Sequence, residues 1–299
     1  MQLHQLKYFV SVVNTGGITK AANHCFISQP SISQQIAKLE ANVGKKLFTK
    51  VNGKLVLTKP GHVLYEQASK ILKNVDDAKR RVTDFDCVNG GSVNIGILPT
   101  LGPFVLPSTL RVLSEKFPEA VVTVREEISE SLVEAAKRGE LDILIEALPF
   151  DEKNLDVEPL FSDPFYLAVH RDNLLAIKKE ISVSSLDNSL SFILLEDMHC
   201  LTRHVEQYCF SENFVPKVSF QTSQINTIKL LIESQYGVSI LPSIATEENL
   251  NSSIRYIKLI SSNLMPAREI VLATAKDRYY SPAAKLFIEA VKKQYQKIG

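Results

Sequence analysis

The sequence predicts an all-α N-terminal domain carrying a β-hairpin, then one long helix, and then an α/β domain. Three observations support this. Residues 1–58 hold short helical patterns and a turn signal between alternating segments, and residues 59–88 hold a helical pattern that continues without a break. From residue 89 to residue 299, strand-like and helix-like segments alternate. A chain of 299 residues is long enough for two or three folded units.

The composition is that of a globular protein. Hydrophobic residues make up 45% of the chain, charged residues of both signs make up 22%, and no apolar run reaches the ~18 residues that a membrane span needs. The first residues also lack the basic and then apolar pattern of a secretory signal. We therefore expect a cytoplasmic protein that does not bind membranes.

Basic residues are concentrated at the N-terminus. Residues 1–60 contain eight lysines, no arginine and a single acid, Glu40, which gives a charge of +7. The other residues carry 26 bases and 32 acids, a balance of −6. An ordinary solvated surface would mix acids among the lysines, whereas a compact basic domain is typical of proteins that bind nucleic-acid phosphates.

The N-terminal pattern predicts a helix-turn-helix. A first helix ends near Asn14, before two glycines, and a second covers residues 18–24. Ser28 is placed to cap a third helix over residues 29–43. Its apolar residues share one face, so its polar residues can reach base edges in the major groove of double-stranded DNA. The residues predicted to contact DNA here are Gln29, Pro30, Ser31, Ser33, Gln34 and Lys38.

A basic hairpin is predicted directly after this helix. Residues 45–58 alternate around the Asn52-Gly53 pair, which is a strong signal for a two-residue turn. Lys50 and Lys54 flank that turn. Because helix-turn-helix geometry also serves for simple packing, the hairpin strengthens the prediction: it would form a wing that reaches phosphates or the minor groove.

The long helix predicts a dimer. Its apolar residues are spaced alternately four and three apart, which is the heptad spacing of a coiled coil. Two such helices would hold two DNA-reading domains over two half-sites. The alternative is that this stripe packs on its own chain. The residues of the predicted seam are Leu64, Ala68, Ile71, Val75, Ala78 and Val82.

Strands and helices alternate from residue 92 onward, which predicts parallel sheets covered by helices on both faces. Ligands bind to such sheets at the carboxyl ends of the strands. A site in this part of the chain is therefore expected at that edge.

Of the four cysteines, Cys200 and Cys209 lie in a segment rich in His and Arg. Positive neighbours lower the pKa of a thiol and favour the reactive thiolate. Zinc is the competing chemistry, but no second closely spaced pair of ligands stands nearby. We expect neither a metal site nor a cofactor, and in a reducing compartment a cysteine pair is more often redox-sensing than structural.

The run Ile18–Ala22, the run Ile27–Ile36 and the pairs Leu39-Glu40 and Leu47-Phe48 resemble the LysR-type regulators. This resemblance implies a winged helix-turn-helix in residues 1–58, a dimerisation helix in residues 59–88 and a regulatory domain in residues 89–299. That domain would have two lobes like a periplasmic binding protein. Lobe I would hold about 92–163 and 268–299, and lobe II about 164–267.

Residues 96–103 and 194–209 are similar to the hydrogen-peroxide-sensing members of that family. The similarity implies an activator of oxidative-stress genes in which Cys200 reacts with peroxide and Cys209 closes a reversible disulfide. It also implies a homotetramer, with RNA polymerase as a further candidate partner. The peroxide pocket that it implies consists of Thr100, Ser129, His199 and Arg268.

Three positions depart from the family pattern. Gln34 replaces a basic residue, Met198 replaces a glycine, and Ser129 lacks the methyl group of threonine. Two other interpretations remain open. The regulator could bind a small organic effector, with both cysteines structural. The chain could also be an enzyme with Cys200 as nucleophile, but adjacent side chains point apart, so His199 is poorly placed as its base; we expect no enzyme.

Overall fold

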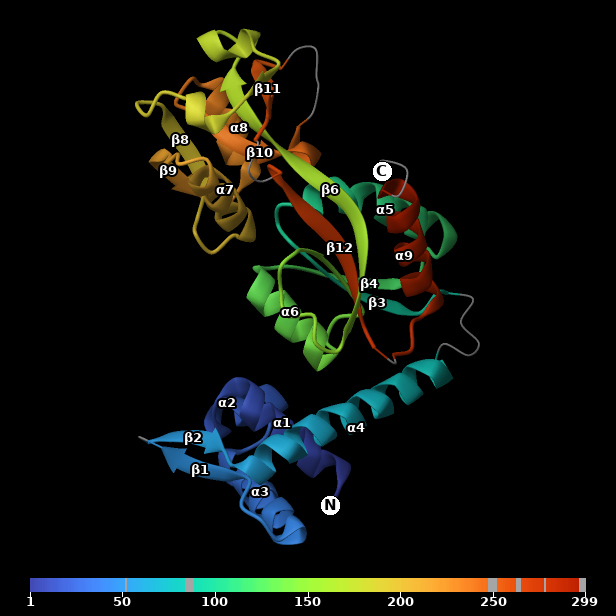
Figure 1. The fold of residues 1–299 in the computed structure, drawn as a ribbon. Helices are drawn as coiled ribbons and strands as arrows, with labels where there is room; N and C mark the ends of the chain where they lie inside the picture. The colour runs from blue at the N-terminus through green and yellow to red at the C-terminus, as the bar shows by residue number, and fades with distance from the viewer. Residues whose placement is uncertain (52, 84–88, 247–251, 262–264, 277, 296–299) are drawn as a thin grey trace. The chain divides into compact units, whose positions relative to one another are not determined.

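The computed structural model describes residues 1–51, 53–83, 89–246, 252–261, 265–276 and 278–295 (Figure 1). The chain divides into two compact units, Met1–Phe85 and Asp86–Gly299. The long helix belongs to the first of them. Residues 84–88, where the dimerisation helix was predicted to end, lie outside the described residues.

The first unit is the predicted winged helix-turn-helix. Gly16 and Gly44 end two of its helices in the left-handed backbone conformation, with φ of 72° and 69°. Ser28 caps the third helix, because its hydroxyl accepts the Ser31 N–H at 3.4 Å. Asn52 of the predicted turn lies outside the described residues. The elements are α1 (Leu3–Thr15), α2 (Ile18–Cys25), α3 (Gln29–Val43), β1 (Phe48–Val51) and β2 (Lys54–Leu57).

The apolar stripe of helix α4 (Lys59–Thr83) is buried in its first half and exposed further along. Ala68 is completely buried in the core of the first unit, and Leu64 packs against the same core. The prediction of one continuous dimer seam is therefore wrong for Ala68, because its own domain covers it. Further along, Ile71 is 38% exposed and Val82 is 79% exposed.

Lobe I of the second unit begins with parallel strands in the order β4-β3-β5. Apolar side chains of these strands and of the helices form its core. The expected alternation of strands and helices is confirmed here. The elements are β3 (Ser92–Ile97), α5 (Gly102–Lys116), β4 (Val121–Glu126), α6 (Ser129–Arg138), β5 (Ile143–Ala147) and, at the end of the chain, α9 (Pro282–Tyr295).

Two long strands connect the lobes. Strand β6 (Leu155–His170) contributes residues to both cores, and β12 (Ala267–Ala275) pairs with it in the antiparallel direction. Arg268 faces Asp163 in this register. The expectation of purely parallel sheets is wrong at this place, because the chain enters lobe II along β6 and returns along β12.

Lobe II is built around a second core among the described residues (Figure 1). Antiparallel β10 and β11 pair with β6, while β8 and β9 form a separate parallel pair. Helix α7 (Cys200–Ser211) follows β8, and short 3₁₀ turns cover 174–177, 183–185 and 243–245. The remaining elements are β7 (Glu180–Ile181), β8 (Ser191–Leu195), β9 (Lys217–Thr222), α8 (Ile225–Glu233), β10 (Ser239–Pro242) and β11 (Ile254–Leu259).

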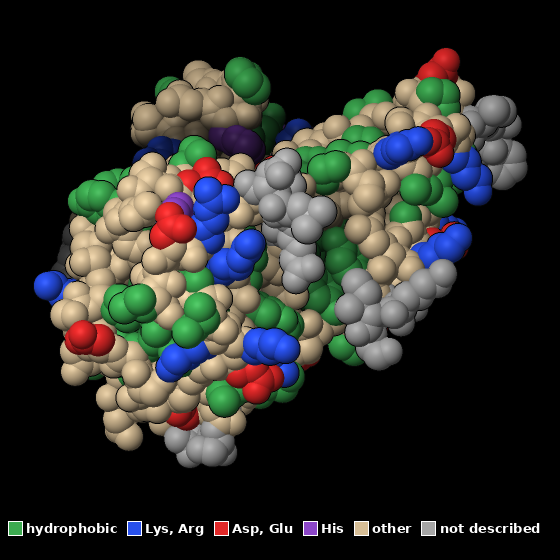
Figure 2. Space-filling view, turned by 90° about the horizontal axis from the view of Figure 1, so that it is seen from above, with side chains coloured by type: hydrophobic (Ala, Val, Ile, Leu, Met, Phe, Trp, Pro, Cys, Tyr) green, Lys and Arg blue, Asp and Glu red, His purple; other side chains and the backbone are tan. Residues whose placement is uncertain are grey.

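On part of the surface, charges of the two signs are interleaved. On the face drawn in Figure 2, Lys and Arg side chains lie in small groups beside Asp and Glu side chains. In lobe I, Arg125 and Arg138 both pair with Glu140, at 2.9 and 2.7 Å. None of the described helices is both long and apolar enough to cross a membrane.

Candidate functional site

Cys200 packs in a different core from the rest of α7. It is the first residue of the helix, is 6% exposed, and packs with the core of lobe I. Leu201, Val205 and Tyr208, later in the same helix, pack in the core of lobe II. Helix α7 therefore contributes side chains to both cores.

Two side chains hold the first turn of α7. The Thr202 hydroxyl donates to the Leu195 carbonyl at 3.0 Å, which fixes the helix to the end of β8. The His204 ring lies between two carbonyl oxygens. Its Nδ1 is 2.7 Å from the backbone oxygen of Cys200, and its Nε2 is 2.7 Å from the backbone oxygen of Leu148, which follows β5 in lobe I. Sequence reasoning considered His204 as a positive neighbour of Cys200 and as a possible catalytic base, and it missed this bridging position.

Cys209 is fully buried in the core of lobe II, and both cysteines are free thiols. The two residues are nine positions apart on one continuous helix. At ~1.5 Å of rise and ~100° of rotation per residue, they lie roughly 13 Å apart along the axis and on opposite faces. Because a disulfide needs Cα atoms within about 7 Å, Cys200 and Cys209 cannot bond while α7 is intact.

Thr100 and Arg268, two residues of the predicted pocket, are in contact. Thr100 follows β3, and its hydroxyl lies 2.8 Å from Nη1 of Arg268 on β12. Arg268 is 1% exposed and also donates from Nε to Asp163 at 3.0 Å. Burial raises the pKa of Asp163, and the charge of Arg268 opposes that rise. No sequence pattern indicated this buried ion pair, because Asp163 and Arg268 lie far apart in the chain.

Ser129, a third predicted pocket residue, begins α6 and is 7% exposed. Its hydroxyl donates to the carboxylate of Glu146, near the end of β5. Glu146 is completely buried; its Oε1 accepts the Ala147 N–H at 2.9 Å, whereas its Oε2 has no hydrogen-bond partner. Burial raises the pKa of Glu146 to about 7. Sequence reasoning missed this residue, although an acid inside the apolar run of residues 143–147 was a signal.

The thiols are less acidic than the sequence suggested. Burial, and secondly the charge of Glu146, raises the pKa of Cys200 to about 11, although Arg268 and Arg203 act in the opposite direction. Burial raises the pKa of Cys209 to about 12. The expectation that positive neighbours lower the pKa of the Cys200 thiol is wrong because desolvation of the thiolate outweighs their attraction.

His199, the fourth predicted pocket residue, stands immediately before α7 and is 7% exposed. Burial lowers its pKa, with Glu196 opposing, so its ring is neutral at pH 7. In the part of the chain that the structure describes, no hydrogen bond joins this ring to Thr100 or Ser129. Within the same ranges, no group of three or more His, Cys, Asp or Glu residues could hold a metal ion.

The face of α3 that was predicted to contact DNA is exposed at most of its residues. Gln29, Pro30, Ser31, Gln34 and Lys38 are exposed, and Ser33 is half-buried. The predicted wing residues Lys50 and Lys54 are exposed on β1 and β2. The buried face of α3 carries Ile32, Ile36 and Leu39.

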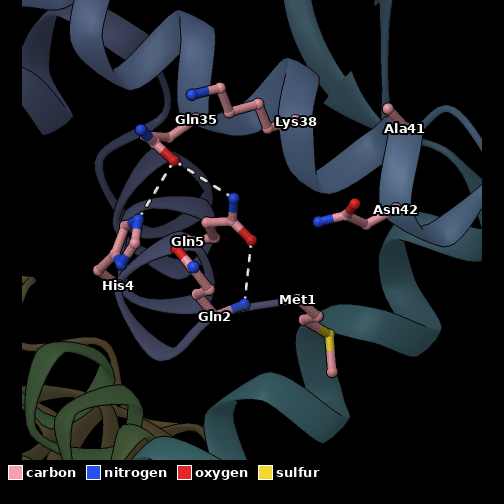
Figure 3. Close-up of a pocket in the computed structure, with 8 residues that line it drawn as sticks. All are labelled: Met1, Gln2, His4, Gln5, Gln35, Lys38, Ala41 and Asn42. Carbon is pink, nitrogen blue, oxygen red and sulfur yellow. Dashed lines mark hydrogen bonds between the residues drawn. The ribbon is translucent and has the colours of Figure 1, made fainter.

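A shallow hollow lies between α3 and the start of α1 (Figure 3). Gln35 anchors it: its side-chain oxygen lies 3.2 Å from Nε2 of His4 and 3.3 Å from Nε2 of Gln5. Lys38 and Asn42 line the same hollow. These bonds fix the orientation of α3 against α1 and thereby orient the face that reads DNA.

These features define a helix-turn-helix N-terminal unit joined to a two-lobed second unit, and family models match both. The model of the bacterial regulatory helix-turn-helix protein of the lysR family matches residues 3–62, and the LysR substrate binding domain matches residues 88–296. The chain belongs to the LysR family of DNA-binding transcriptional regulators.

Similar proteins include peroxide regulators. The hydrogen peroxide-inducible genes activator of Haemophilus influenzae is 30% identical over 274 residues, covering 91% of this chain and 90% of the relative. The uncharacterized HTH-type transcriptional regulator YcgK of Bacillus subtilis is 29% identical over 307 residues, covering 97% and 93%. A solved full-length OxyR from Pseudomonas aeruginosa, a cysteine-to-aspartate variant, has a TM-score of 0.71 at 26% identity and covers 99% and 95%.

Proposed function

We propose that this regulator senses hydrogen peroxide through Cys200 and Cys209 and passes the result to promoter DNA. The observation that carries the proposal is the position of Cys200, at the start of α7, packed into lobe I and influenced by Arg268. Cys209 lies in the core of lobe II on the same helix. The relatives named as hydrogen peroxide-inducible genes activators support the same assignment.

The chemistry has two steps. The Cys200 sulfur attacks one peroxide oxygen; an S–O bond forms, the O–O bond breaks, and the leaving oxygen takes up the thiol proton to give water. The sulfur is oxidised to a sulfenic acid and the peroxide is reduced. The Cys209 thiol then attacks the sulfenic sulfur, an S–S bond forms, and a second water leaves. Thr100, Ser129, His199 and Arg268 orient the oxidant.

Refolding of α7 is the switch in this proposal. Because the intact helix keeps the two cysteines on opposite faces, the disulfide forms only when the turns between them unwind. Unwinding removes Cys200 from the core of lobe I and breaks the His204 bridge between Cys200 and Leu148. The two redox states thus correspond to two folded arrangements of one segment.

The output is a change in how a homodimer, or a homotetramer built from two dimers, binds its operator. The exposed half of the α4 stripe, from Ile71 to Val82, is the surface we assign to the dimer. Gln29, Pro30, Ser31, Ser33, Gln34 and Lys38 read base edges, and Lys50 and Lys54 bind phosphates. RNA polymerase is the partner at activated promoters, those of oxidative-stress genes.

A second candidate is a small organic effector bound between the lobes, with both cysteines structural. One observation favours it: burial keeps both thiols protonated at neutral pH, so neither is a preformed thiolate. In that case the Cys200→Ser variant responds to a metabolite as the wild type does.

The deciding experiment treats the reduced full-length protein with equimolar peroxide and maps its disulfides by mass spectrometry, with operator binding followed in parallel. The expected result is a Cys200–Cys209 disulfide and altered binding. In a Cys209→Ser variant the sulfenic acid persists and reacts with dimedone. Cys25→Ser, on α2, is the matched control and keeps the response. Unlinked Cys200 and Cys209 with unchanged DNA binding would refute the proposal.

A further inference from the structure

Glu146 is a buried acid at the carboxyl edge of the sheet of lobe I. The ends of β3 and β5 and the start of β12 meet there, which brings Glu146 near Thr100 and Arg268. Its Oε1 is held by the Ala147 N–H, and Ser129 donates to the same carboxylate. Its Oε2 is buried without any partner. Leaving such an oxygen desolvated and without a hydrogen bond is unfavourable, and more so when it is charged, so it needs a functional explanation.

The reactive group to consider is the Cys200 thiol. Among charged residues, Glu146 has the largest electrostatic effect on Cys200, and the Cys200 side chain shares the lobe I core with Ala147, the neighbour of Glu146. The thiol is buried and protonated, so it must lose its proton to some group before it can act as a nucleophile. Glu146 combines the burial and the free oxygen that this step requires. His204, which contacts both the Cys200 and the Leu148 oxygens, places the residues after β5 beside the first turn of α7.

We propose that Glu146 accepts the proton of the Cys200 thiol through Oε2 as the sulfur attacks peroxide. This inference rests on the proposed peroxide reaction. In the step, the S–H bond breaks and its proton moves to the carboxylate while the S–O bond forms and the O–O bond breaks. The departing hydroxide then takes the proton back from Glu146 and leaves as water. Glu146 ends unchanged, the sulfur is oxidised to a sulfenic acid, and the peroxide is reduced.

The surroundings suit this exchange of a proton. The groups that act on Glu146 are Ser129 on α6, Arg268 on β12, and Cys200 and Arg203 on α7. Burial sets the pKa of Glu146 to about 7, so the carboxylate and the acid are both available at neutral pH. A group with a pKa near the working pH is the most effective one for accepting a proton and then returning it.

The test separates this role from a purely electrostatic one, because the two predict opposite signs. Oxidation of Cys200 by peroxide is measured in a Cys209→Ser background, by acid quenching and counting free thiols. If Glu146 accepts the proton, Glu146→Gln slows oxidation at pH 8 by roughly 100-fold or more. If it acts only through its charge, Glu146→Gln lowers the pKa of the thiol and speeds oxidation. An equal or faster rate in the variant overturns the inference.

Further measurements guard against misfolding. The wild-type rate is expected to rise with pH and to level off above about pH 7, following the ionisation of Glu146. A flat wild-type profile between pH 6 and 8 overturns the inference even if no variant folds. Glu146→Asp recovers part of the rate, and Glu130→Gln, exposed on α6, is the matched control. A wild type that peroxide does not oxidise at any pH overturns the proposed function as well, whereas normal oxidation with an unimpaired Glu146→Gln overturns the inference alone.

Discussion

The raised pKa of Glu146 predicts that lobe I loses stability as the pH rises. In the unfolded chain this carboxyl ionises with its ordinary pKa of 4.5, whereas in the folded protein it ionises at about 7. Its neutral form is therefore preferred on folding. The resulting contribution to stability is complete below pH 4.5 and is lost as the pH rises through 7. The rise of this pKa from 4.5 to about 7 corresponds to about 3 kcal/mol of folding stability. About three quarters of that stability is lost between pH 5 and pH 8.

The substitution Glu146→Gln tests this pH-dependent contribution to stability, because glutamine keeps the shape of the side chain but cannot ionise. We expect the variant to gain about 2–3 kcal/mol relative to the wild type when the comparison moves from pH 5 to pH 8. Taking the difference between two pH values cancels hydrogen-bond changes that do not depend on pH. Because the chain has more than one folded unit, a single melting curve does not isolate lobe I.

The assay is hydrogen–deuterium exchange of the slowest amides in β3 and β5, converted to opening free energies at each pH. Glu130→Gln, on the exposed surface of α6, serves as the control and should show no such difference. The reasoning is refuted if Glu146→Gln and the wild type differ by the same amount at pH 5 and pH 8, or if the variant is relatively less stable at pH 8.

Three other predictions concern the rest of the chain. Ile71→Glu, on the exposed half of the α4 stripe, should convert the proposed dimer to a monomer, as measured by light scattering. Glu66→Lys, off the stripe, should not. An unchanged mass for Ile71→Glu would show that the stripe does not form the dimer interface. Ser28→Ala should destabilise α3 by about 1 kcal/mol, seen as faster amide exchange in its first turn, with weaker operator binding; unaltered exchange would mean that the cap is unimportant. His204→Leu should leave the first turn of α7 less protected from exchange and should speed formation of the disulfide from Cys200, whereas slower disulfide formation would contradict the bridging role.

The N-terminal unit could be predicted closely from sequence because its signals are local. The Ser28 cap, the glycine ends and the apolar spacing of α3 all act within a few residues, so helix limits followed from the chain alone. Ala68 shows where this stops. Its heptad spacing is the same whether the partner is another copy or its own domain, and only the packing of α4 on α1 decides between them.

The sensing site was predicted in part. Thr100 and Arg268 were expected in one pocket, and they are joined by a hydrogen bond. His199 was expected in the same pocket, but no hydrogen bond among the described residues links it to either of them. The acidity of Cys200 was predicted in the wrong direction because nearby charges can be read from sequence, whereas the degree of desolvation cannot. Glu146 was missed since its effect depends on strands that are distant in sequence.

The single strand β6 restricts how the two lobes can move relative to each other. Because β6 passes unbroken through both cores and is bonded along β12, no flexible loop separates the lobes at this crossing, and a wide hinge closure would have to twist a continuous hydrogen-bonded ribbon. The hydrogen bonds that hold the first turn of α7 go instead to Leu195, at the end of β8, and to Leu148, which follows β5. In the proposed switch, a change that begins at Cys200 would therefore reshape α7 and its outer surface more readily than it would close a cleft.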